Sequence, residues 1–317
     1  MLVELGNENL IFAPSQEKAL HLPILRTREI HNHHMNSKAW DAINFRPDDV
    51  IISTYAKSGT TWMQQIVSQL IFGGEEGLDV SAMSPWVDLR IMPAEAIAAL
   101  NQQPHRRFLK THLPVDALLF NPQAKYIYVA RDGRDVVWSL YNHHVHANQA
   151  FFDAINNTLG RVGPALGPAP DNVVTYFNDW LEGDGAPFWS FWENVRSWWQ
   201  IRALPQVKMV HFSDLKRDLE GSIRSIAHFL DIELDGPTFA KVMDHCSFAY
   251  MKDHAELAAP LGGALWQGGA RTFINKGTNG RWKDILPTAL SHAYEARARR
   301  ELGDACAAWL RDGGAVI

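Results

Sequence analysis

A short segment from Thr54 to Trp62 combines the residue types that bind an anion through a backbone loop. It follows the apolar run Val50–Ile52, which is typical of a buried strand, and it precedes apolar residues at helical spacing. The first turn of a helix presents unpaired N–H groups and the positive end of a dipole, and both favour phosphate or sulfate. Gly59 permits close backbone approach and Lys57 adds a full charge. The segment therefore predicts an anion site at the start of a helix.

The order of residues in this loop differs from that of a Walker A loop. A Walker A loop has Gly-Lys-Ser/Thr at the helix start, with the hydroxyl on magnesium. Here Lys57 precedes Gly59, and no Gly-Lys-Ser/Thr lies nearby. A P-loop kinase or NTPase is retained as an alternative function, although it needs that turn and a strand-end aspartate for magnesium. Taken alone, the loop could also be a Ser/Thr-rich helix cap with an incidental lysine.

Two further segments carry residues suited to acid–base chemistry and phosphate binding. His112 lies in Lys110–Pro114 (KTHLP), just after a short apolar strand candidate. A histidine pKa, ordinarily near 6.5, suits a general base at neutral pH. Taken alone, His112 could equally be a structural histidine at a strand end. Arg131 follows the strand candidate Lys125–Ala130, and its planar guanidinium can bind phosphate oxygens bidentately.

Taken together, these segments resemble those of the cytosolic type of sulfotransferase, which uses 3'-phosphoadenosine 5'-phosphosulfate (PAPS). The loop resembles the family's 5'-phosphosulfate loop, KTHLP the segment with the catalytic base, and Arg131–Ser139 the 3'-phosphate segment. Further similar segments follow in the same order at 211–215, 247–251 and 273–282. The resemblance spans about residues 51–284. It implies sulfuryl transfer from PAPS to the hydroxyl group of a small-molecule alcohol or phenol.

The resemblance also implies roles for individual residues. His112 would take the proton from the acceptor, and Lys57 would stabilise the leaving phosphate oxygen. Lys110 would neutralise the sulfuryl oxygens, and Ser139 would bind the 3'-phosphate and restrain Lys57. Sulfuryl transfer is in-line and spreads less charge than phosphoryl transfer, so no metal is expected. The residues expected to hold the nucleotide are Lys57, Ser58, Gly59, Thr60, Thr61, Trp62, Arg131, Ser139, Phe212, Ser247, Phe248, Met251, Asn275, Lys276 and Gly277.

The sequence departs from the family pattern at two places. Asn275 stands where the family has an arginine that contacts the 3'-phosphate, while Lys276 is retained and Arg281 is close enough in sequence to compensate. Because of this departure, a catalytically silent protein that binds a 3'-phosphoadenosine nucleotide is retained as an alternative function. The family's dimer motif, KxxxTVxxxE, is not matched by residues 283–292, so a homodimer stays open rather than implied.

An aromatic segment, 188–201, suggests where the acceptor would bind. Its tryptophans recur at helical spacing, which is typical of a buried core helix. The alternative is an apolar wall of the acceptor pocket, which would favour an apolar or aromatic acceptor. The candidates for acceptor contact are Trp189, Trp192 and His144.

Composition limits the partners. The formal net charge of −5 argues against nonspecific binding to nucleic acid or to an anionic membrane. The two cysteines cannot build a disulfide framework, and the first residues lack the pattern of a signal peptide, so a cytoplasmic location is expected. The histidines at 31–34 and 143–146 do not have zinc-ligand spacing, and no metal site is predicted there.

Strand and helix patterns alternate along the chain. Strands are expected at 50–52, 107–109, 125–130 and 207–212, and helices at 61–72, 132–144, 188–201, 223–230, 238–245 and 286–310. This alternation predicts an α/β fold with a mainly parallel central sheet flanked by helices and a P-loop-like site. No linker is evident, so residues 1–317 are expected to form a single domain. Glycine-rich loops are expected at 158–171 and 258–280, the second as a lid.

Overall fold

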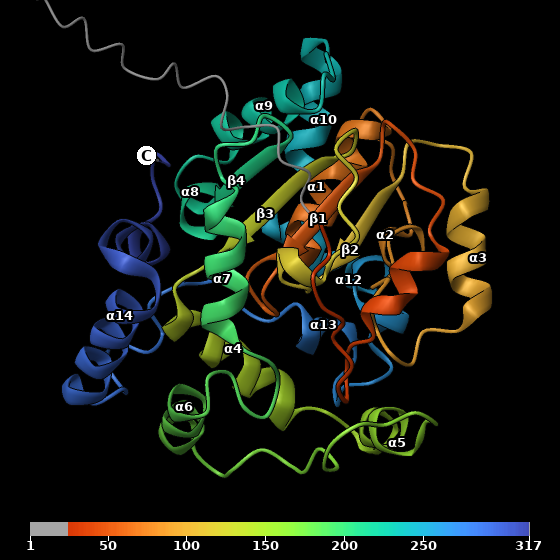
Figure 1. Ribbon diagram of the computed structural model, residues 1–317. Helices are drawn as coiled ribbons and strands as arrows, with labels where there is room; N and C mark the ends of the chain where they lie inside the picture. The colour runs from red at the N-terminus through yellow and green to blue at the C-terminus, as the bar shows by residue number, and fades with distance from the viewer. Residues whose placement is uncertain (1–24, 317) are drawn as a thin grey trace, which may run out of the picture.

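A parallel sheet of four strands lies at the centre of the computed structural model, which describes residues 25–316 (Figure 1). The strand order is β2-β1-β3-β4. Parallel neighbours need crossover connections, and helices supply them here. The expected parallel α/β fold is thereby confirmed. The strands are β1 (Val50–Thr54), β2 (Phe108–Thr111), β3 (Lys125–Ala130) and β4 (Val207–His211).

The central strands bury both faces of the sheet, because successive side chains point to opposite sides. On β1, Val50 and Ile52 belong to one hydrophobic cluster, whereas Ile51 belongs to another. On β3, Ile127 is in the first cluster and Tyr128 in the second. These two clusters are the cores on the two sides of the sheet, and they explain the nearly continuous apolar runs in the sequence.

One side of the sheet is covered by α1 (Thr60–Ile71), α9 (Leu219–Phe229) and α10 (Gly236–His245), whose buried residues share the cluster with Val50. The other side is covered by α4 (Gly133–Val145), α6 (Val173–Glu182), α7 (Phe191–Gln200) and α14 (Thr288–Asp312). The other helical segments are η2 (Ser37–Ala42), α2 (Val80–Met83), α3 (Ala94–Gln102), η3 (Val115–Ala117), α5 (Gln149–Asn157), α8 (Phe212–Arg217), α11 (Phe248–Asp253), α12 (Ala255–Ala258), η4 (Pro260–Gly263) and α13 (Ala270–Phe273).

Several expected boundaries shift in the structure. The aromatic helix begins at Phe191 rather than at 188, because the Ser190 side chain caps it by accepting from the Glu193 N–H. The glycine-rich segment 258–280 is not free of helix, since it contains η4 and α13. The loop expected at 158–171 is confirmed between α5 and α6. The sequence patterns missed α3, α5 and α6 entirely.

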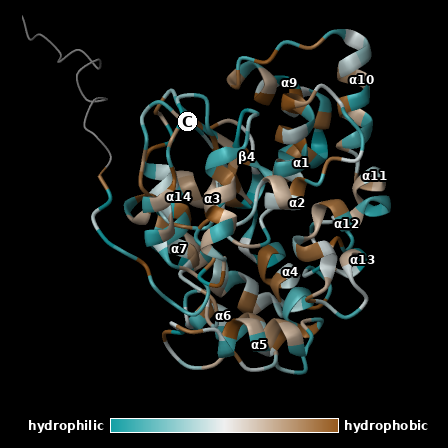
Figure 2. Ribbon diagram, turned by 90° about the vertical axis from the view of Figure 1, so that its right-hand side faces the viewer, coloured by the Kyte–Doolittle hydropathy of each residue, from teal (hydrophilic) through white to brown (hydrophobic). Residues whose placement is uncertain are grey.

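The outer helices alternate between hydrophilic and hydrophobic residues along their length, as helices with one buried face do (Figure 2). None of the helices between residues 25 and 316 is long and apolar enough to cross a membrane. The expectation that the chain lacks a signal peptide concerns residues outside the described range.

Candidate active site

The anion loop predicted from the sequence connects β1 to α1 in a conformation that a glycine makes possible. Lys57 has a φ of 65° and Gly59 a φ of 115°, both in the left-handed region. A Cβ atom on Gly59 would lie 2.8 Å from a ring carbon of Phe212. Thr60 begins α1, and its hydroxyl lies 2.7 Å from that of Thr54. The loop therefore presents the start of a helix to the space beyond the sheet.

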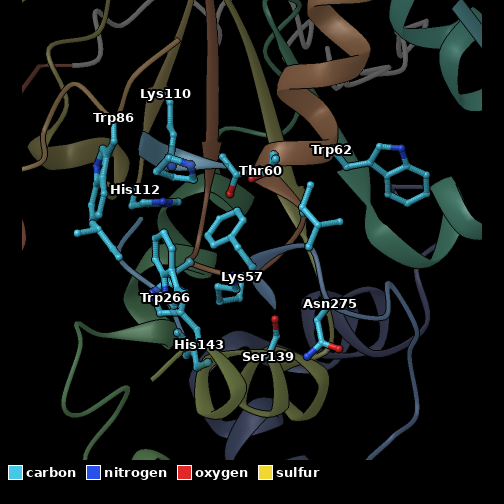
Figure 3. Close-up of a pocket in the computed structure, with 18 of the residues that line it drawn as sticks. Lys57, Thr60, Trp62, Trp86, Lys110, His112, Ser139, His143, Trp266 and Asn275 are labelled. Carbon is cyan, nitrogen blue, oxygen red and sulfur yellow. The ribbon is translucent and has the colours of Figure 1, made fainter. Parts of the chain in front are cut away.

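The carboxyl ends of all four strands meet at this loop and surround a cavity of about 270 Å³ (Figure 3). β1 leads to Lys57 and Thr60, β2 carries Lys110 and leads to His112, and β3 leads to Arg131. This is the edge at which open parallel sheets bind ligands. Segments far apart in the sequence thus place three cations and one histidine in the wall of a single cavity.

His112 is held in one orientation by the end of β1. Its Nδ1 atom lies 2.7 Å from the carbonyl oxygen of Thr54 and 3.2 Å from the Thr54 hydroxyl. A carbonyl oxygen can only accept, so Nδ1 carries the hydrogen and Nε2 keeps its lone pair. Burial, together with the charge of Lys110, holds the pKa of His112 well below its usual value. The imidazole is therefore neutral near pH 7 and able to accept a proton at Nε2.

Two buried lysines, Lys57 and Lys110, line the cavity beside the anion loop. Burial, and then repulsion from Lys110 and Arg131, lowers the pKa of Lys57 to about 7. Burial lowers the pKa of Lys110 to about 8, against the attraction of Asp88. The Lys57 ammonium lies 4.2 Å from the centre of the Phe273 ring, and that of Lys110 lies 5.5 Å from the Trp86 ring. An anionic ligand would restore charge to both amines.

Arg131 is fixed from several sides. Its guanidinium donates to the side chain of Asn279 at 3.0 Å and to the backbone oxygen of Thr278 at 2.8 Å. The guanidinium also lies 4.2 Å from the centre of the Phe212 ring. Burial lowers the pKa of Arg131 to about 10, so it stays charged near neutral pH. A fixed cation therefore stands beside the anion loop.

A smaller recess of about 40 Å³ adjoins the main cavity on the side of Arg131 and Ser139. Lys276, Thr278 and Arg281 also line it, and Asn275 lines both spaces. Three cationic side chains, those of Arg131, Lys276 and Arg281, thus surround this small space. Asp135 is part of the same wall, where it accepts a hydrogen bond from the Gly280 N–H at 2.7 Å. Burial raises the pKa of Asp135 to about 6.

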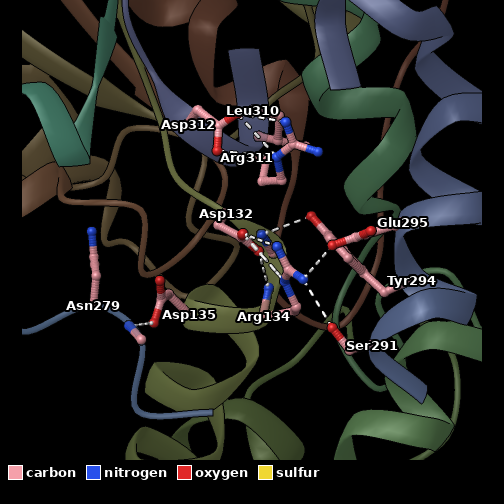
Figure 4. Close-up of polar contacts among 12 residues, drawn as sticks. Asp132, Arg134, Asp135, Asn279, Ser291, Tyr294, Glu295, Leu310, Arg311 and Asp312 are labelled. Carbon is pink, nitrogen blue, oxygen red and sulfur yellow. Dashed lines mark hydrogen bonds and ion pairs between the residues drawn. The ribbon is translucent and has the colours of Figure 1, made fainter. Parts of the chain in front are cut away.

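A buried ion-pair network ties this recess to the C-terminal helix (Figure 4). Arg134 donates to both carboxylate oxygens of Asp132, at 3.1 Å and 2.6 Å. It also donates to Ser291 and Glu295 of α14, both at 2.9 Å. The Gly133 N–H at the start of α4 donates to the Tyr294 hydroxyl at 2.9 Å. The helix that carries Ser139 is therefore anchored to α14.

The aromatic residues expected beside the nucleotide lie at the far end of the main cavity. Trp62 and Phe212 meet edge to face, with ring centres 5.4 Å apart. Phe248 and Met251 of α11 also line the cavity. A Cβ atom on Gly277 would lie 2.7 Å from the Phe248 ring, so that ring rests directly on the glycine backbone.

Two predicted nucleotide-binding residues do not line the cavity. Ser58 is buried within the turn, where its N–H donates to the Tyr55 carbonyl at 3.3 Å. The Ser247 hydroxyl caps α11 by accepting from the Tyr250 N–H at 3.1 Å. Both residues shape the site from behind. The other predicted nucleotide-binding residues line the main cavity or the recess.

Of the three predicted acceptor residues, the structure places one in the wall of the main cavity and two outside it. Trp189 lines the main cavity, and its ring centre lies 5.7 Å from that of His112. Trp192 does not line it, because α7 turns this side chain into the core, where its ring centre lies 5.5 Å from that of Tyr294. His144 also points away, toward the Gly167 carbonyl at 2.8 Å. The preceding residue, His143, takes its place in the cavity wall.

Sequence reasoning missed several residues of this wall, including Trp86, Phe151 and Trp266. Trp86 packs edge-on against His112, with ring centres 4.6 Å apart, and its indole N–H donates to Asp88 at 2.7 Å. The aromatic richness of the chain, 12 tryptophans and 15 phenylalanines, was the available signal, and it does not say which rings face a cavity. Within residues 25–316, no three His, Cys, Asp or Glu side chains gather as metal ligands would.

Comparisons with known proteins agree with this geometry. A glycolipid sulfotransferase of Mycobacterium tuberculosis is 30% identical over 302 residues, covering 86% of this chain and 91% of the relative. Sulfotransferase 1A1 of Mus musculus is 30% identical over 273 residues, covering 82% and 84%. The crystal structure of mouse sulfotransferase SULT7A1 complexed with PAP has a TM-score of 0.67 at 20% identity and covers 86% of this chain and 92% of that one.

A second solved structure, retinol dehydratase in complex with androsterone and the inactive cofactor PAP, has a TM-score of 0.62 at 22% identity and covers 84% of each chain. At these identities, the two structural likenesses concern the fold. The family model described as the sulfotransferase domain matches residues 47–305. Because that match spans most of the sequence, the chain belongs to the sulfotransferase family and is a sulfotransferase.

Proposed function

We propose that the main cavity binds PAPS and that the protein transfers its sulfuryl group to a hydroxyl group of a small apolar or aromatic molecule. The observation that carries this proposal is the convergence of Lys57, Lys110 and neutral His112 on one cavity, beside a cationic recess. A donor with two separate anionic groups needs two separate cationic sites. The relatives named above support the reaction class.

The donor is oriented with its 5'-phosphosulfate in the main cavity and its 3'-phosphate in the recess. The 5'-phosphosulfate lies at the start of α1, where Lys57 and the Thr60 hydroxyl face the cavity. The 3'-phosphate enters the recess beside Arg131 and Ser139. The adenine ring then lies among the aromatic side chains at the far end, which are Trp62, Phe212 and Phe248. The two solved structures compared above contain PAP, the desulfated form of this donor.

Arg281 compensates for the missing arginine at position 275. Asn275 lines the recess but brings no charge, whereas the Arg281 guanidinium reaches the same recess from the next turn of the segment. It lies over the Trp138 ring, 5.9 Å from the ring centre. The recess therefore keeps three cationic side chains, Arg131, Lys276 and Arg281, for a group that carries about two negative charges.

Transfer proceeds by in-line displacement at sulfur. The acceptor oxygen forms a bond to sulfur while the bond from sulfur to the 5'-phosphate oxygen breaks, and the electron pair of that bond stays on the phosphate. Nε2 of His112 takes the acceptor's proton. Lys57 neutralises the departing phosphate oxygen, and Lys110 the sulfuryl oxygens. Ser139 restrains Lys57 before the acceptor enters. These steps use protein groups for positioning and charge.

The acceptor enters from the side of Trp86 and Trp189, where the cavity wall is apolar. The relatives suggest the same kind of molecule, since one is named for glycolipids and another was solved with androsterone. A cytoplasmic location, where PAPS-dependent modification of small molecules would occur, is part of this proposal.

Calorimetric titration with PAP, using AMP as the comparison, tests the donor site. Tight binding of PAP with weak binding of AMP is expected, because only PAP carries the 3'-phosphate that fills the recess. Equal affinities would refute the donor assignment. Tight PAP binding without sulfation of any alcohol or phenol offered with PAPS would instead support a silent nucleotide-binding protein.

A further inference from the structure

The acceptor side of the main cavity is apolar except for a few ring nitrogens. Apolar side chains from six separate segments form most of its wall, which is lined by Leu89, Ile91, Leu140, Phe151, Ala154, Ile155, Phe188, Leu265 and Phe273. Nitrogen-containing rings interrupt this lining, and among them are His143, Trp189 and Trp266. Such a wall binds the body of an apolar molecule, and the interruptions decide how that molecule is oriented.

These three rings each carry a buried nitrogen that has no hydrogen-bond partner among the residues the structure describes. The atoms are Nε1 of Trp189, Nε1 of Trp266 and Nδ1 of His143. Trp266 is 5% exposed and Trp189 is 9% exposed. By contrast, Trp40 and Trp86 both donate to Asp88. Buried polar groups normally have partners, so three unpaired nitrogens around one cavity point to a ligand that supplies them.

The unpaired indole nitrogen of Trp192 shows why several unpaired nitrogens must lie around the same cavity before they indicate a ligand. That nitrogen also lacks a partner among the described residues, but Trp192 is in the core and lines neither the main cavity nor the recess. One orphaned indole is therefore no sign of a ligand. His143 and Trp266 differ because they lie together in a cavity wall, with ring centres 4.8 Å apart.

Trp266 and His143 are both held in place by the protein. The backbone N–H of Trp266 donates to the Gly263 carbonyl at 3.1 Å, and its backbone also pairs with that of Ala147, just beyond α4. His143 is in the last turn of α4 and packs between Trp266 and Phe151. Figure 3 shows both rings on the left of the cavity, below His112 and Trp86, with Asn275 on the opposite side; His143 lies nearest to Ser139, which is on the same helix. They therefore belong to the acceptor side.

We propose that the acceptor carries, besides the hydroxyl group that is sulfated, a neutral carbonyl oxygen that is bound by the Trp266 indole N–H and the His143 imidazole. This proposal rests on the proposed sulfotransferase function and names its substrate class, the hydroxylated ketones and esters with an apolar body. Trp189, next to His112, faces the end of the molecule that carries the hydroxyl group.

The charges around the cavity favour a neutral oxygen over a carboxylate. Burial, and then the charge of Lys57, holds the pKa of His143 well below its usual value, so the ring is neutral and offers a single N–H. A carboxylate would be drawn to the ammonium groups of Lys57 and Lys110, where it would compete with the phosphosulfate of the donor. A carbonyl oxygen accepts two hydrogen bonds without that competition.

Matched pairs of acceptors test this inference. The compound 4-(4-hydroxyphenyl)butan-2-one differs from 4-butylphenol by one carbonyl, which two methylene groups separate from the ring, so the acidity of the phenol is the same. The ratio of kcat/KM for the ketone to that for the alkyl compound isolates the second oxygen. A second pair, in which a saturated cyclohexane ring replaces the aromatic ring of both compounds, tests alcohols in place of phenols. In the wild-type protein, we expect a ratio of about 5 to 10 in at least one pair, because the net free energy of one hydrogen bond corresponds to a factor of about this size.

Substitutions identify the atoms responsible. Trp266→Phe removes the indole N–H and His143→Phe removes the imidazole, and each should bring the ratio close to one. Leu89→Met changes an apolar side chain of the same wall, on a segment that carries neither ring, and should leave the ratio as it is. PAP affinity, measured by calorimetry on each variant, shows that the donor site and the fold are intact.

The outcomes separate this inference from the function on which it rests. The inference is overturned if the wild-type ratio is near one for both the phenol pair and the alcohol pair. It is also overturned if Trp266→Phe and His143→Phe both preserve the wild-type ratio. Tight PAP binding with no sulfation of any of the four compounds overturns the substrate class while leaving the donor site standing. Failure of the wild-type protein to bind PAP overturns the proposed function itself.

Discussion

The Nδ1 atom of His112 donates a hydrogen bond to the backbone carbonyl of Thr54, 2.7 Å away, at the point where β1 ends and the anion loop begins. The bond links the end of β1 to the segment that follows β2. It fixes the imidazole tautomer and leaves Nε2 as the basic atom on the cavity side. In the proposed mechanism, the strand that leads to the anion loop therefore also orients the base.

Replacement of His112 by alanine should abolish most of the activity while leaving donor binding intact. Loss of a general base lowers kcat by about 100- to 10,000-fold. Steady-state sulfation assays measure this loss, and titration with PAP checks the nucleotide site. His228→Ala, an exposed histidine on α9, is the matched control. A fall of less than tenfold for His112→Ala would show that another group, or water, removes the proton.

Donor binding should weaken as the pH rises from about 6 to 9. The pKa of Lys57 in the free protein is lowered to about 7 and that of Lys110 to about 8, so both amines are charged below this range and neutral above it. An anionic ligand raises both pKa values again, so binding at pH 9 must take up as many as two protons. The phosphates themselves have second pKa values near 6 and are ionised throughout most of this range.

Calorimetry of PAP binding in buffers with different ionisation enthalpies counts these protons directly. Little uptake is expected at pH 6 and the largest uptake near pH 9. Lys57→Met should remove about one proton from the count at high pH. Uptake that stays near zero across the whole range would mean that the two lysines remain charged in the free protein.

Arg281→Gln should weaken PAP binding much more than AMP binding. A charge-assisted hydrogen bond contributes about 1.5–3 kcal/mol, so the PAP affinity should fall by about 10- to 150-fold. AMP lacks the 3'-phosphate and should bind the variant as it binds the wild type. Arg300→Gln makes the same change of charge at an exposed position of α14 and serves as the control. Equal effects on the two nucleotides would remove Arg281 from the phosphate recess.

Arg134→Met should destabilise the fold. The Arg134 side chain is 3% exposed, and its removal leaves the Asp132 carboxylate buried without its partner. Breaking a buried pair in this way costs about 3–5 kcal/mol. Urea unfolding measures the free energy of unfolding of the variant. Arg224→Met breaks an exposed pair with Glu220 and should cost less than about 1 kcal/mol. Similar losses for the two variants would contradict the importance of the network.

The sequence was most informative where local chemistry decides local structure. The strand 125–130 was predicted with its observed bounds, because a continuous apolar run with both faces buried has few alternatives. The loop around Lys57 and Gly59 was likewise predicted, since its geometry depends on glycine and on the helix that follows. Most of the predicted nucleotide-binding residues line the two cavities for the same reason.

The acceptor side could not be predicted in this way. His143 and His144 are neighbours on α4, yet the first lines the cavity and the second bonds to the Gly167 carbonyl. Similarly, Trp189 lines the cavity whereas Trp192 packs in the core, because α7 begins between them. Which ring faces a cavity depends on how distant segments pack, and a pattern within one segment contains no such information. Trp266 reaches the wall from a segment whose short helical turns leave no clear periodicity.

The contact between Gly59 and Phe212 has a consequence for how donor preference can evolve. The Phe212 ring fills the space beside Gly59 and also lies over Arg131, so in the proposed binding mode one side chain supports both the wall beside the adenine and the loop that holds the sulfate. A substitution at 212 that tuned the protein toward another nucleobase would also release the loop backbone. In that binding mode, base selectivity and sulfate alignment depend on the same side chain, so a change in one would bring a change in the other.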